Sequence, residues 1–375
     1  MIRNNNFPKL YKYLDKCSEG GFYNITKLLT FQRILNFIVG SRSIGKSTAV
    51  ACLCILNYII NGKMFIYCRR TKDEVLLTCR SFFDNAVKII NTKCKGMGLP
   101  VIKCVEYKAG KFYIQIEGKE TDEQCGYCIP LSLEQKHKSA TFSEYNIIIY
   151  DEFIATDNAR YLGNVDYPDR EYDSLMSLFQ TVDRGIDEPF RDETIIICMG
   201  NNWSKYNPIF LSLNISDYIE DNSRWIKPKD ELWILHNIGD VAATKDAGQH
   251  SNAYLLANQK LRDYAFNNIS TESTEYIKKP DPSIKVEYYM TLKYDGREFG
   301  VLRQQDNFYI GKPRKGQDIV ALHNRDHFGS DLKLLTSWRE EPIMMILIEA
   351  YKKNNLYFAT GLAKNEFLKY FKLAF

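Results

Sequence analysis

Residues 35–48 read Leu35-Asn-Phe-Ile-Val-Gly-Ser-Arg-Ser-Ile-Gly-Lys-Ser-Thr48, an apolar run that breaks into a glycine-bounded loop. The loop satisfies the pattern G-x-x-x-x-G-K-[ST], in which the glycines let backbone N–H groups surround phosphates, the lysine reaches the outer phosphates and the hydroxyl ligates Mg²⁺. That pattern requires a strand before the loop and a helix after it, and the runs 33–39 and 49–60 supply both. A strand, turn and helix that bind nothing is the weaker interpretation.

The loop is therefore predicted to hold the phosphates of a nucleotide, with Lys46 also acting in catalysis and Ser47 also binding the metal ion. The dipole of the following helix would add to the attraction for anions. The predicted loop contacts are Gly40, Ser41, Arg42, Ser43, Ile44, Gly45, Lys46, Ser47 and Thr48.

Strand and helix patterns alternate after the loop. The short apolar run 64–68 predicts a strand, and 73–91 follows with apolar residues at the spacing of one helix. This alternation predicts a parallel α/β sheet. Three short alternating segments, 101–107, 111–117 and 126–131, then predict an antiparallel insertion.

The segment 145–152 is a buried-strand pattern that ends in two acids, Asp151 and Glu152. In a phosphate-loop ATPase the strand beside the phosphates ends in an aspartate that holds Mg²⁺, and a glutamate can polarise the attacking water. The pair therefore predicts the metal ligand and the catalytic carboxylate. An adjacent glutamate is typical of the additional-strand catalytic-glutamate (ASCE) ATPases, and the N-K-x-D signature of guanine-nucleotide switches is missing. ATP with Mg²⁺ is the predicted ligand.

Two further polar positions follow the acids. The helical pattern 174–182 ends before Arg184, which either complements the dipole of its own helix or enters the phosphate site of a neighbouring subunit. The apolar strand pattern 193–199 ends before Asn201 and Asn202, where such ATPases sense the γ-phosphate, although asparagine is also a common turn residue. Asn201 is the predicted nucleotide contact.

Length and composition limit the class of protein. At about 150 residues per domain, 375 residues predict two domains. No run approaches the length of a membrane span, and the tract Asn4-Asn5-Asn6 stands where a secretion signal would be apolar. We therefore expect a soluble intracellular protein with no membrane partner.

The ten cysteines all lie in the first 198 residues, several of them inside apolar segments, which predicts buried reduced thiols. Cys125 and Cys128 form one C-x-x-C pair, which Cys104 and His137 could complete as a zinc site. No second pair at zinc spacing is present, so ordinary strand cysteines are the favoured interpretation.

Charge is distributed unevenly along the chain. Residues 1–150 carry a net +10, residues 151–250 a net −10 and residues 251–375 a net +4. A basic front with an acidic middle fits binding to a polyanion, attraction between successive copies of the chain, or solvated faces that segregate without a function.

Taken together, these sequence segments resemble those of the DNA-packaging ATPases, or encapsidation proteins, of small podophages, which are compact relatives of large terminases. The matching residues are Arg33–Ser47, Phe65-Ile-Tyr-Cys-Arg-Arg70, Ile129-Pro-Leu-Ser132, Tyr150-Asp-Glu-Phe153, Arg160-Tyr-Leu162, Thr181-Val-Asp-Arg184 and Asn207-Pro-Ile-Phe-Leu211. The resemblance extends from about residue 28 to 215 and weakens toward the C-terminus.

The resemblance implies a motor that pulls double-stranded DNA into a preformed head. It implies a homo-oligomeric ring, by resemblance a pentamer, docked on the portal (connector) protein of the prohead in the host cytoplasm, with a prohead RNA in some members. In that family the arginine of the T-V-x-R segment completes the neighbour's active site, which favours Arg184 as a trans-acting residue. Arg42 becomes the candidate arginine that couples the nucleotide to its own domain.

The C-terminal third predicts a second, smaller α+β domain. Segments 286–293, 297–304 and 307–311 read as an antiparallel meander, and helical patterns at 343–354 and 364–371 follow. Strands followed by helices suit an RNase H-like sheet of the kind that terminase nucleases use. A nuclease of that kind needs several carboxylates around two metal ions. Only Glu287 lies within the first strand, while Asp295 and Asp306 lie in turns, so a degenerate nuclease is expected.

We therefore predict an ASCE phosphate-loop ATPase domain at 1–205, a linker at 206–235, and a vestigial RNase H-like domain at 236–375 that binds nucleic acid or the portal. Basic residues such as Lys278, Lys279 and 312–315 would form that surface, although ordinary solubilising charge explains them equally well. The predicted function is an ATP-driven DNA translocase. The alternatives are a terminase with an active C-terminal nuclease and an ATP-binding scaffold without turnover.

Overall fold

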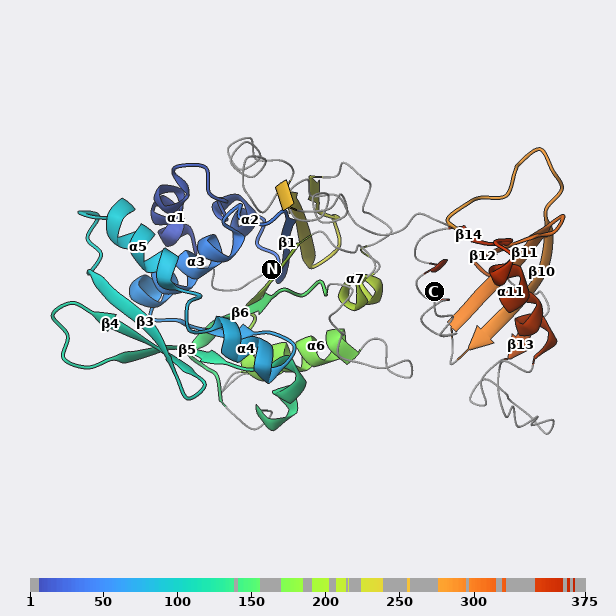
Figure 1. Cartoon of the computed structure of the whole chain (residues 1–375). Helices are drawn as coiled ribbons and strands as arrows, with labels where there is room; N and C mark the ends of the chain where they lie inside the picture. The colour runs from blue at the N-terminus through green and yellow to red at the C-terminus, as the bar shows by residue number, and fades with distance from the viewer. Residues whose placement is uncertain are drawn as a thin grey trace. The chain divides into compact units, whose positions relative to one another are not determined.

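In the computed structural model, the residues that the structure describes form two compact units, and the described residues of the second unit begin at Tyr276 (Figure 1). The described residues are 7–137, 141–155, 170–184, 191–201, 207–213, 215, 224–238, 255–256, 276–294, 297–314, 319–321, 341–359, 363–364 and 367. The first unit holds the phosphate loop and both acids. It is therefore the unit that positions the candidate site.

The first unit is built on a mixed sheet whose described strands follow the order β3-β4-β5-β2-β6-β7-β1-β9-β8. Their bounds are β1 Leu35–Gly40, β2 Met64–Cys68, β3 Ile102–Lys108, β4 Lys111–Ile116, β5 Glu123–Cys128, β6 Tyr145–Asp151, β7 Ile195–Gly200, β8 Trp225–Ile226 and β9 Trp233–Ile238. From β5 to β9 every neighbouring pair is parallel. The predicted parallel α/β sheet is confirmed, and the antiparallel insertion continues the same sheet as β3, β4 and β5.

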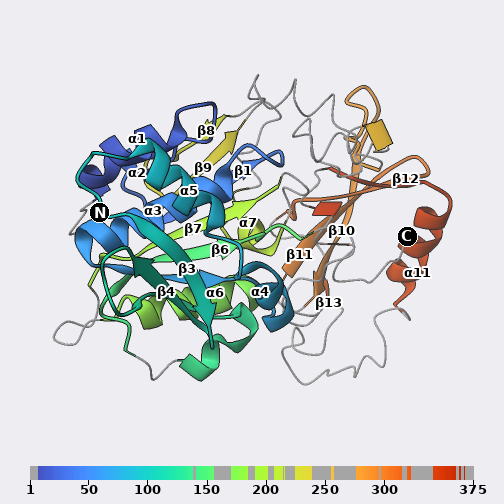
Figure 2. The same ribbon diagram turned by 60° about the vertical axis from the view of Figure 1, so that its left-hand side comes forward.

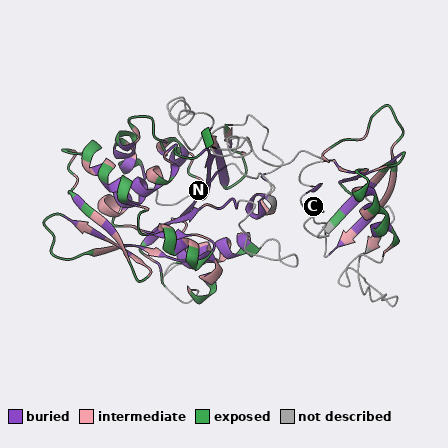
Figure 3. Ribbon diagram, viewed as in Figure 1, coloured by how far each residue is buried: buried purple, intermediate pink, exposed green. Residues whose placement is uncertain are grey.

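Both faces of the parallel strands are covered, which is why their sequences are continuous apolar runs. Alternate residues of a strand enter opposite cores: Ile38 packs on one face, and Phe37 and Val39 pack on the other. Helices α1 Tyr11–Ser18, α2 Thr26–Thr30, α3 Lys46–Asn61, α4 Lys72–Thr78 and α5 Asp84–Lys93 contribute to the first core. Helices α6 Arg170–Val182 and α7 Pro208–Ser212 contribute to the second. Short 3-10 helices occupy Phe7–Leu10 and Leu131–His137. Figure 3 shows the buried strands between helices whose outer faces are exposed.

The single helix predicted at 73–91 is wrong, because the chain forms two helices there. A capping box between Thr71 and Glu74 starts α4, and the chain leaves the helix after Thr78 before α5 begins at Asp84. In the break, Phe82 and Phe83 turn toward the rings of Tyr67 and Phe65. Helical spacing could not distinguish this arrangement, because the same apolar residues serve both.

The predicted domain boundary is also wrong. Residues 206–235 were expected to form a linker, yet they supply α7 and β8 and lead directly into β9. Strand β9 pairs in parallel with β1, with Trp233 beside Leu35, and the Trp233 side chain is buried. The run 233–238 is therefore an inner strand of the first sheet, and the second unit starts later than predicted.

The second unit contains a described sheet of order β13-β10-β11-β12-β14. Its elements are β10 Glu287–Tyr294, β11 Arg297–Gln304, β12 Asn307–Gly311, β13 Ile319–Ala321, β14 Leu356–Phe358 and helix α11 Pro342–Lys352. The meander β10-β11-β12 is antiparallel, as predicted, while β13 and β14 add in parallel at the two edges. The predicted helix at 364–371 lies mostly outside the described residues. Figure 2 shows α11 and the sheet of this unit from a second side.

Two expectations about the whole chain can be compared with the structure. All ten cysteines are unpaired, and nine of them are buried, including Cys125 and Cys128 on β5. Within the described ranges, no helix is both long and apolar enough to cross a membrane.

A buried ion pair joins the end of β2 to helix α6. The Arg70 guanidinium lies 3.2 Å from the Glu171 carboxylate, and both side chains are almost completely buried, with exposed fractions of 3% and 0%. Tyr150 donates a hydrogen bond to the same carboxylate. Because buried charges are stable only when they are paired, this contact fixes α6 against the sheet.

We predict that Arg70→Met lowers the free energy of unfolding by about 3–5 kcal/mol, because it leaves the Glu171 carboxylate buried without its counter-charge. Chemical denaturation followed by circular dichroism would measure the change. The double variant Arg70→Met/Glu171→Leu should recover much of the loss, and Lys108→Met, which breaks the exposed pair with Asp122, should change stability little. A single variant as stable as the parent would contradict this assignment.

Candidate functional site

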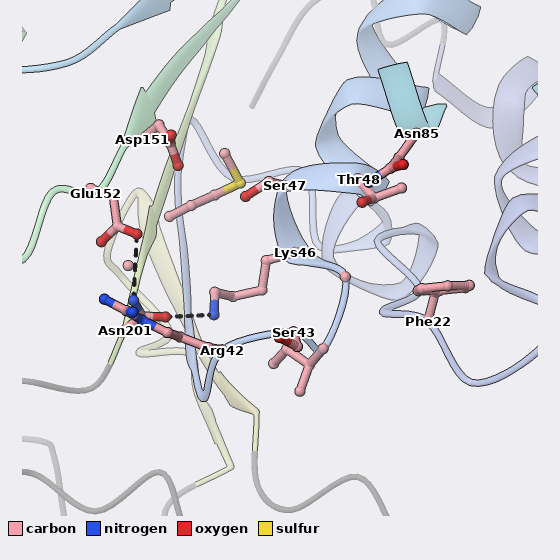
Figure 4. A pocket seen from close by; sticks show the side chains of 14 residues that line it. Phe22, Arg42, Ser43, Lys46, Ser47, Thr48, Asn85, Asp151, Glu152 and Asn201 are labelled. Carbon is pink, nitrogen blue, oxygen red and sulfur yellow. Dashed lines mark hydrogen bonds between the residues drawn. The ribbon is translucent and has the colours of Figure 1, made fainter. Parts of the chain in front are cut away.

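Three parallel strands end at one edge of the first sheet, and each carries a polar group just beyond its end. The pairing places Val39 beside Gly200, and Met199 beside Asp151. The phosphate loop after β1, Asn201 after β7 and the acids at the end of β6 therefore gather in one place (Figure 4). The carboxyl ends of parallel strands are where α/β proteins place their ligands.

These groups surround a cavity of about 420 Å³, within the size range of small-molecule sites. The lining residues are Phe22, Arg42, Ser43, Ile44, Gly45, Lys46, Ser47, Thr48, Asn85, Asp151, Glu152, Met199, Gly200 and Asn201. The structure therefore brings together most of the loop residues and both acids that the sequence singled out. Phe22 and Asn85 also line the cavity, and neither belongs to a sequence motif.

The two glycines of the phosphate loop, Gly40 and Gly45, are required for different structural reasons. A Cβ at Gly40 would lie 2.7 Å from the Ile44 side chain, so the start of the loop has no space for one. Gly45 has φ +86°, a left-handed conformation that favours glycine, and its Cβ would meet the Phe22 ring at 2.9 Å. Helix α3 begins directly after it at Lys46, so the helix N-terminus faces the cavity.

Lys46 is a buried cation held by oxygen atoms of its own loop. Its ammonium donates to the carbonyl groups of Gly40 at 2.8 Å and Ser41 at 2.7 Å, and to Oδ1 of Asn201 at 3.1 Å. Burial lowers the pKa of Lys46 to about 8, against the opposing effect of the carboxylates Glu152 and Asp151. A phosphate anion in the cavity would supply the counter-charge that this ammonium lacks in its own loop.

Asn201 bridges Lys46 and Glu152. Its Oδ1 accepts from the ammonium, and its Nδ2 donates to Oε1 of Glu152 at 3.4 Å. Both ends of the amide are therefore used in the orientation that their chemistry requires. Asn201 therefore lies at the cavity beside Lys46 and Glu152, while Asn202 lies outside the described residues.

Glu152, the residue after β6, has an unusual backbone conformation. Its φ is +56°, a region that residues other than glycine rarely adopt and that concentrates at functional sites. Burial, and then the neighbouring Asp151 carboxylate, raise the pKa of Glu152. A carboxyl group with a raised pKa is a better proton acceptor when it is ionised, as a general base requires.

Asp151 is held by two residues that no sequence motif had placed in the site. Tyr67 Oη donates to its Oδ2 at 2.9 Å, and Arg69 donates to the same oxygen through Nε at 3.1 Å. The register explains the contact, because β2 pairs in parallel with β6 and places Cys68 beside Tyr150. Arg69, the residue after β2, therefore lies next to Asp151, the last residue of β6. Strand order was needed to see this, since the two residues are 82 positions apart.

The oxygen donors suit a magnesium ion. Ser47 provides a hydroxyl group and Asp151 a carboxylate, both lining the same cavity, and hard oxygen ligands are those that Mg²⁺ prefers. The donor set therefore fits the ion that the sequence predicted.

The two predicted arginines lie in different places. Arg42 is exposed and lines the cavity from the phosphate loop. Arg184 is exposed beyond the end of α6, and it does not line this cavity. The preceding Asp183 is buried and accepts hydrogen bonds from the backbone N–H groups of residues 192–194, which fixes the end of α6.

An N-terminal segment lies against the phosphate loop. The Tyr23 N–H donates to the Ile44 carbonyl at 3.0 Å, and the Tyr23 hydroxyl lies 3.0 Å from Nδ1 of His236 on β9. The His236 ring stacks on Trp225 with centroids 3.6 Å apart. Tyr23 thus anchors the segment to β9, the strand beside β1. This anchor holds Phe22, the residue before Tyr23, beside the cavity.

Comparison with known proteins gives consistent results. The model of the podovirus DNA encapsidation protein (Gp16) family matches residues 15–373. The DNA packaging protein of Bacillus phage PZA is 35% identical over 350 residues, which cover 92% of this chain and 95% of that protein. The DNA packaging protein of Bacillus phage phi29 is 27% identical over equal shares of the two chains. A solved structure, the bacteriophage phi29 viral genome packaging motor assembly, matches with a TM-score of 0.69 at 25% identity, covering 94% of this chain and 99% of that chain.

The anchor of the N-terminal segment should make stability depend on pH. Burial, followed by the charges of Arg224 and Lys27, lowers the pKa of His236 to about 4, from an ordinary value near 6.5. As the pH falls, His236 is protonated in the unfolded chain before it is protonated in the folded chain. The contribution of neutral His236 to the free energy of unfolding is therefore complete above about pH 6.5 and is lost between about pH 6.5 and 4.

We predict that the free energy of unfolding falls by about 3 kcal/mol over this interval because of His236. Unfolding free energies of the parent and of His236→Phe, measured at several pH values, would isolate it. The variant should lose less stability than the parent on acidification, because phenylalanine cannot take up a proton. Parallel pH profiles for the two proteins would show that His236 does not titrate as described.

Proposed function

The chain belongs to the podovirus DNA encapsidation protein family, and on that premise we propose that it is an ATP-hydrolysing motor that moves double-stranded DNA into a viral prohead. The observation that carries the proposal is the convergence of Lys46, Asp151 and Glu152 on one cavity. A cation for phosphates, a carboxylate for a metal ion and a second carboxylate for water are the groups that ATP hydrolysis requires.

The sheet order supports assignment to the ASCE class of phosphate-loop ATPases. Strand β7 lies between the phosphate-loop strand β1 and the acid-bearing strand β6. That additional strand is the feature for which the class is named, and it carries Asn201 at its end. The catalytic glutamate next to the metal aspartate is the second feature, and Glu152 meets it.

In the proposed reaction Lys46 and the N–H groups of the phosphate loop bind the β- and γ-phosphates. Glu152 accepts a proton from a water molecule, whose oxygen attacks the γ-phosphorus while the bond to the bridging oxygen of ADP breaks. Asn201 contacts both Lys46 and Glu152, so it is placed to respond when a γ-phosphate arrives. Ser47 and Asp151 would hold Mg²⁺, which when bound neutralises charge on the phosphates.

Arg184 is proposed to act on the nucleotide of a neighbouring subunit. It is exposed and lies outside its own cavity, while the end of α6 that carries it is held firmly through Asp183. A cation presented from a rigid helix end suits insertion into another copy, where a trans-acting arginine stabilises the charge of the transition state. The arrangement requires a head-to-tail contact between copies, which a closed ring supplies to every subunit. We propose that this ring is a pentamer. Arg42, exposed at the rim of its own cavity, is proposed to pass nucleotide state to the rest of its subunit.

The second unit is proposed to be a vestigial RNase H-like domain that contacts nucleic acid or the portal protein, including a prohead RNA where one is used. Its meander, with β13 added in parallel beside β10, supports that fold. Glu287 is exposed, and the described part of the unit has no cluster of acids that could hold metal ions; Asp295 lies outside the described residues. Lys278, Lys312 and Arg314 are exposed cations on it. The motor would work in the host cytoplasm while docked on the prohead.

We predict that double-stranded DNA stimulates phosphate release from ATP, and that Glu152→Gln reduces the rate by about 100-fold or more, because the amide cannot accept the proton from water. A phosphate-release assay with and without DNA would measure both effects. Glu144→Gln, at an exposed glutamate outside the cavity, is the matched control and should behave as the parent does. Nucleotide binding without turnover in the parent would indicate a scaffold, and metal-dependent DNA cleavage would indicate an active nuclease.

We predict that mixing Glu152→Gln subunits with Arg184→Ala subunits restores turnover that neither variant shows alone. In a random ring, roughly a quarter of the interfaces pair an intact glutamate with an intact arginine. Phosphate release, measured across a series of mixing ratios, should pass through a maximum near equal amounts. If every mixture stays inactive although both variants assemble, Arg184 does not act in trans.

A further inference from the structure

One end of the cavity is not used by the proposed phosphate chemistry. The acids and Asn201 lie on one side of the Lys46 ammonium, and Phe22 lies on the other side of the phosphate loop (Figure 4). Thr48, in the first turn of α3, and Asn85 lie beside each other above Phe22 in the same view. All three belong to the cavity lining. This end therefore offers an aromatic ring and an amide next to a phosphate site.

Phe22 is exposed where an aromatic ring would ordinarily be buried. Its exposed fraction is 46%, whereas that of the adjacent Tyr23 is 7%. Two contacts of Tyr23 explain the difference: its backbone N–H donates to the Ile44 carbonyl, and its buried hydroxyl is hydrogen-bonded to His236. The chain thus holds the Phe22 ring at the cavity without covering it. A rigidly held, open aromatic face is a stacking platform for a nucleobase.

The Phe22 ring packs closely against Gly45 of the phosphate loop. The nearest atoms to a Cβ at Gly45 would be Cδ1 and Cβ of Phe22, at 2.9 and 3.2 Å. The ring therefore lies directly beside the loop residue that precedes Lys46. A nucleotide whose phosphates occupy the loop would have its nucleoside within reach of the same ring.

Asn85 supplies the hydrogen-bonding group of this end. It is the second residue of α5, and its side chain is exposed to the cavity. A primary amide can donate to one atom and accept from its neighbour, which matches the adjacent N7 and N6 amino group of adenine. Guanine presents two acceptors at these positions, so the same amide can satisfy only one of them.

We propose that Phe22 and Asn85 form the base-binding end of the nucleotide site and select adenine, Phe22 by stacking and Asn85 by reading the edge of the ring. This inference rests on the proposed ATPase function, because it assumes that the phosphates occupy the loop. It adds to the proposed site the residues that discriminate between adenine and guanine nucleotides. It also gives the N-terminal segment a role in substrate binding.

The test compares a ligand that has a base with one that has none. Calorimetric titration of the full-length chain with Mg²⁺ and ATPγS, and separately with Mg²⁺ and inorganic tripolyphosphate, gives both affinities. Phe22→Ala should weaken ATPγS binding about tenfold or more and leave tripolyphosphate binding unchanged, because only the stacking contact is lost. Leu77→Ala, at a leucine 82% exposed on α4, is the matched control for removing a surface apolar side chain.

Each outcome decides one point. Equal losses for both ligands would show that Phe22 only supports the loop, and an unchanged ATPγS affinity would show that it touches no base; either result overturns the stacking assignment. Asn85→Leu should bring the affinities for ATPγS and GTPγS closer together, and an unchanged ratio overturns the assignment of Asn85. If the parent binds neither ATPγS nor tripolyphosphate, the proposed ATPase function itself fails.

Discussion

Everything in the site depends on the parallel pairing of β6, β7 and β1. Hydrogen bonds between these strands fix which residues reach the same edge of the sheet, and a shift in register would separate them. Asp151, Asn201 and the phosphate loop are distant in sequence, yet the pairs Asp151–Met199 and Val39–Gly200 bring them to one cavity. The two apolar cores on either side of the sheet keep that register in place. The chemistry of the site is thus a consequence of strand packing.

The charged groups Lys46 and Asp151 are hydrogen-bonded by the protein's own groups. Lys46 rests on loop carbonyl groups and Asn201, and Asp151 rests on Tyr67 and Arg69. Burial, and then the Asp151 carboxylate, raise the pKa of Tyr67, which keeps it a phenol able to donate. A bound nucleotide with its metal ion would compete for the same atoms. In the proposed function, binding would therefore exchange the present partners of Lys46 and Asp151. Those partners, Asn201 and Arg69, directly follow β7 and β2.

Local patterns predicted the site well where the chemistry is encoded in adjacent residues. The loop 40–48 and the acids of β6 could be located from spacing alone, because glycine, lysine, hydroxyl and carboxylate each have a definite role there. Phe22, Arg69 and Asn85 could not, because each reaches the site only through the tertiary fold. The domain boundary failed for the same reason: the run 233–238 has no partner in its own neighbourhood, and its pairing with β1 appears only in the assembled sheet.

The central claim is that a nucleotide binds along the loop between Phe22 and the acids. Hydrogen–deuterium exchange of the full chain, with and without Mg²⁺ and ATPγS, tests this directly, because a bound ligand protects the backbone amides that it contacts or stabilises. The account predicts slower exchange in peptides covering 40–48 and 20–25, and unchanged exchange in 297–311. Protection confined to other segments, with 40–48 exchanging as before while the nucleotide is bound, would contradict it.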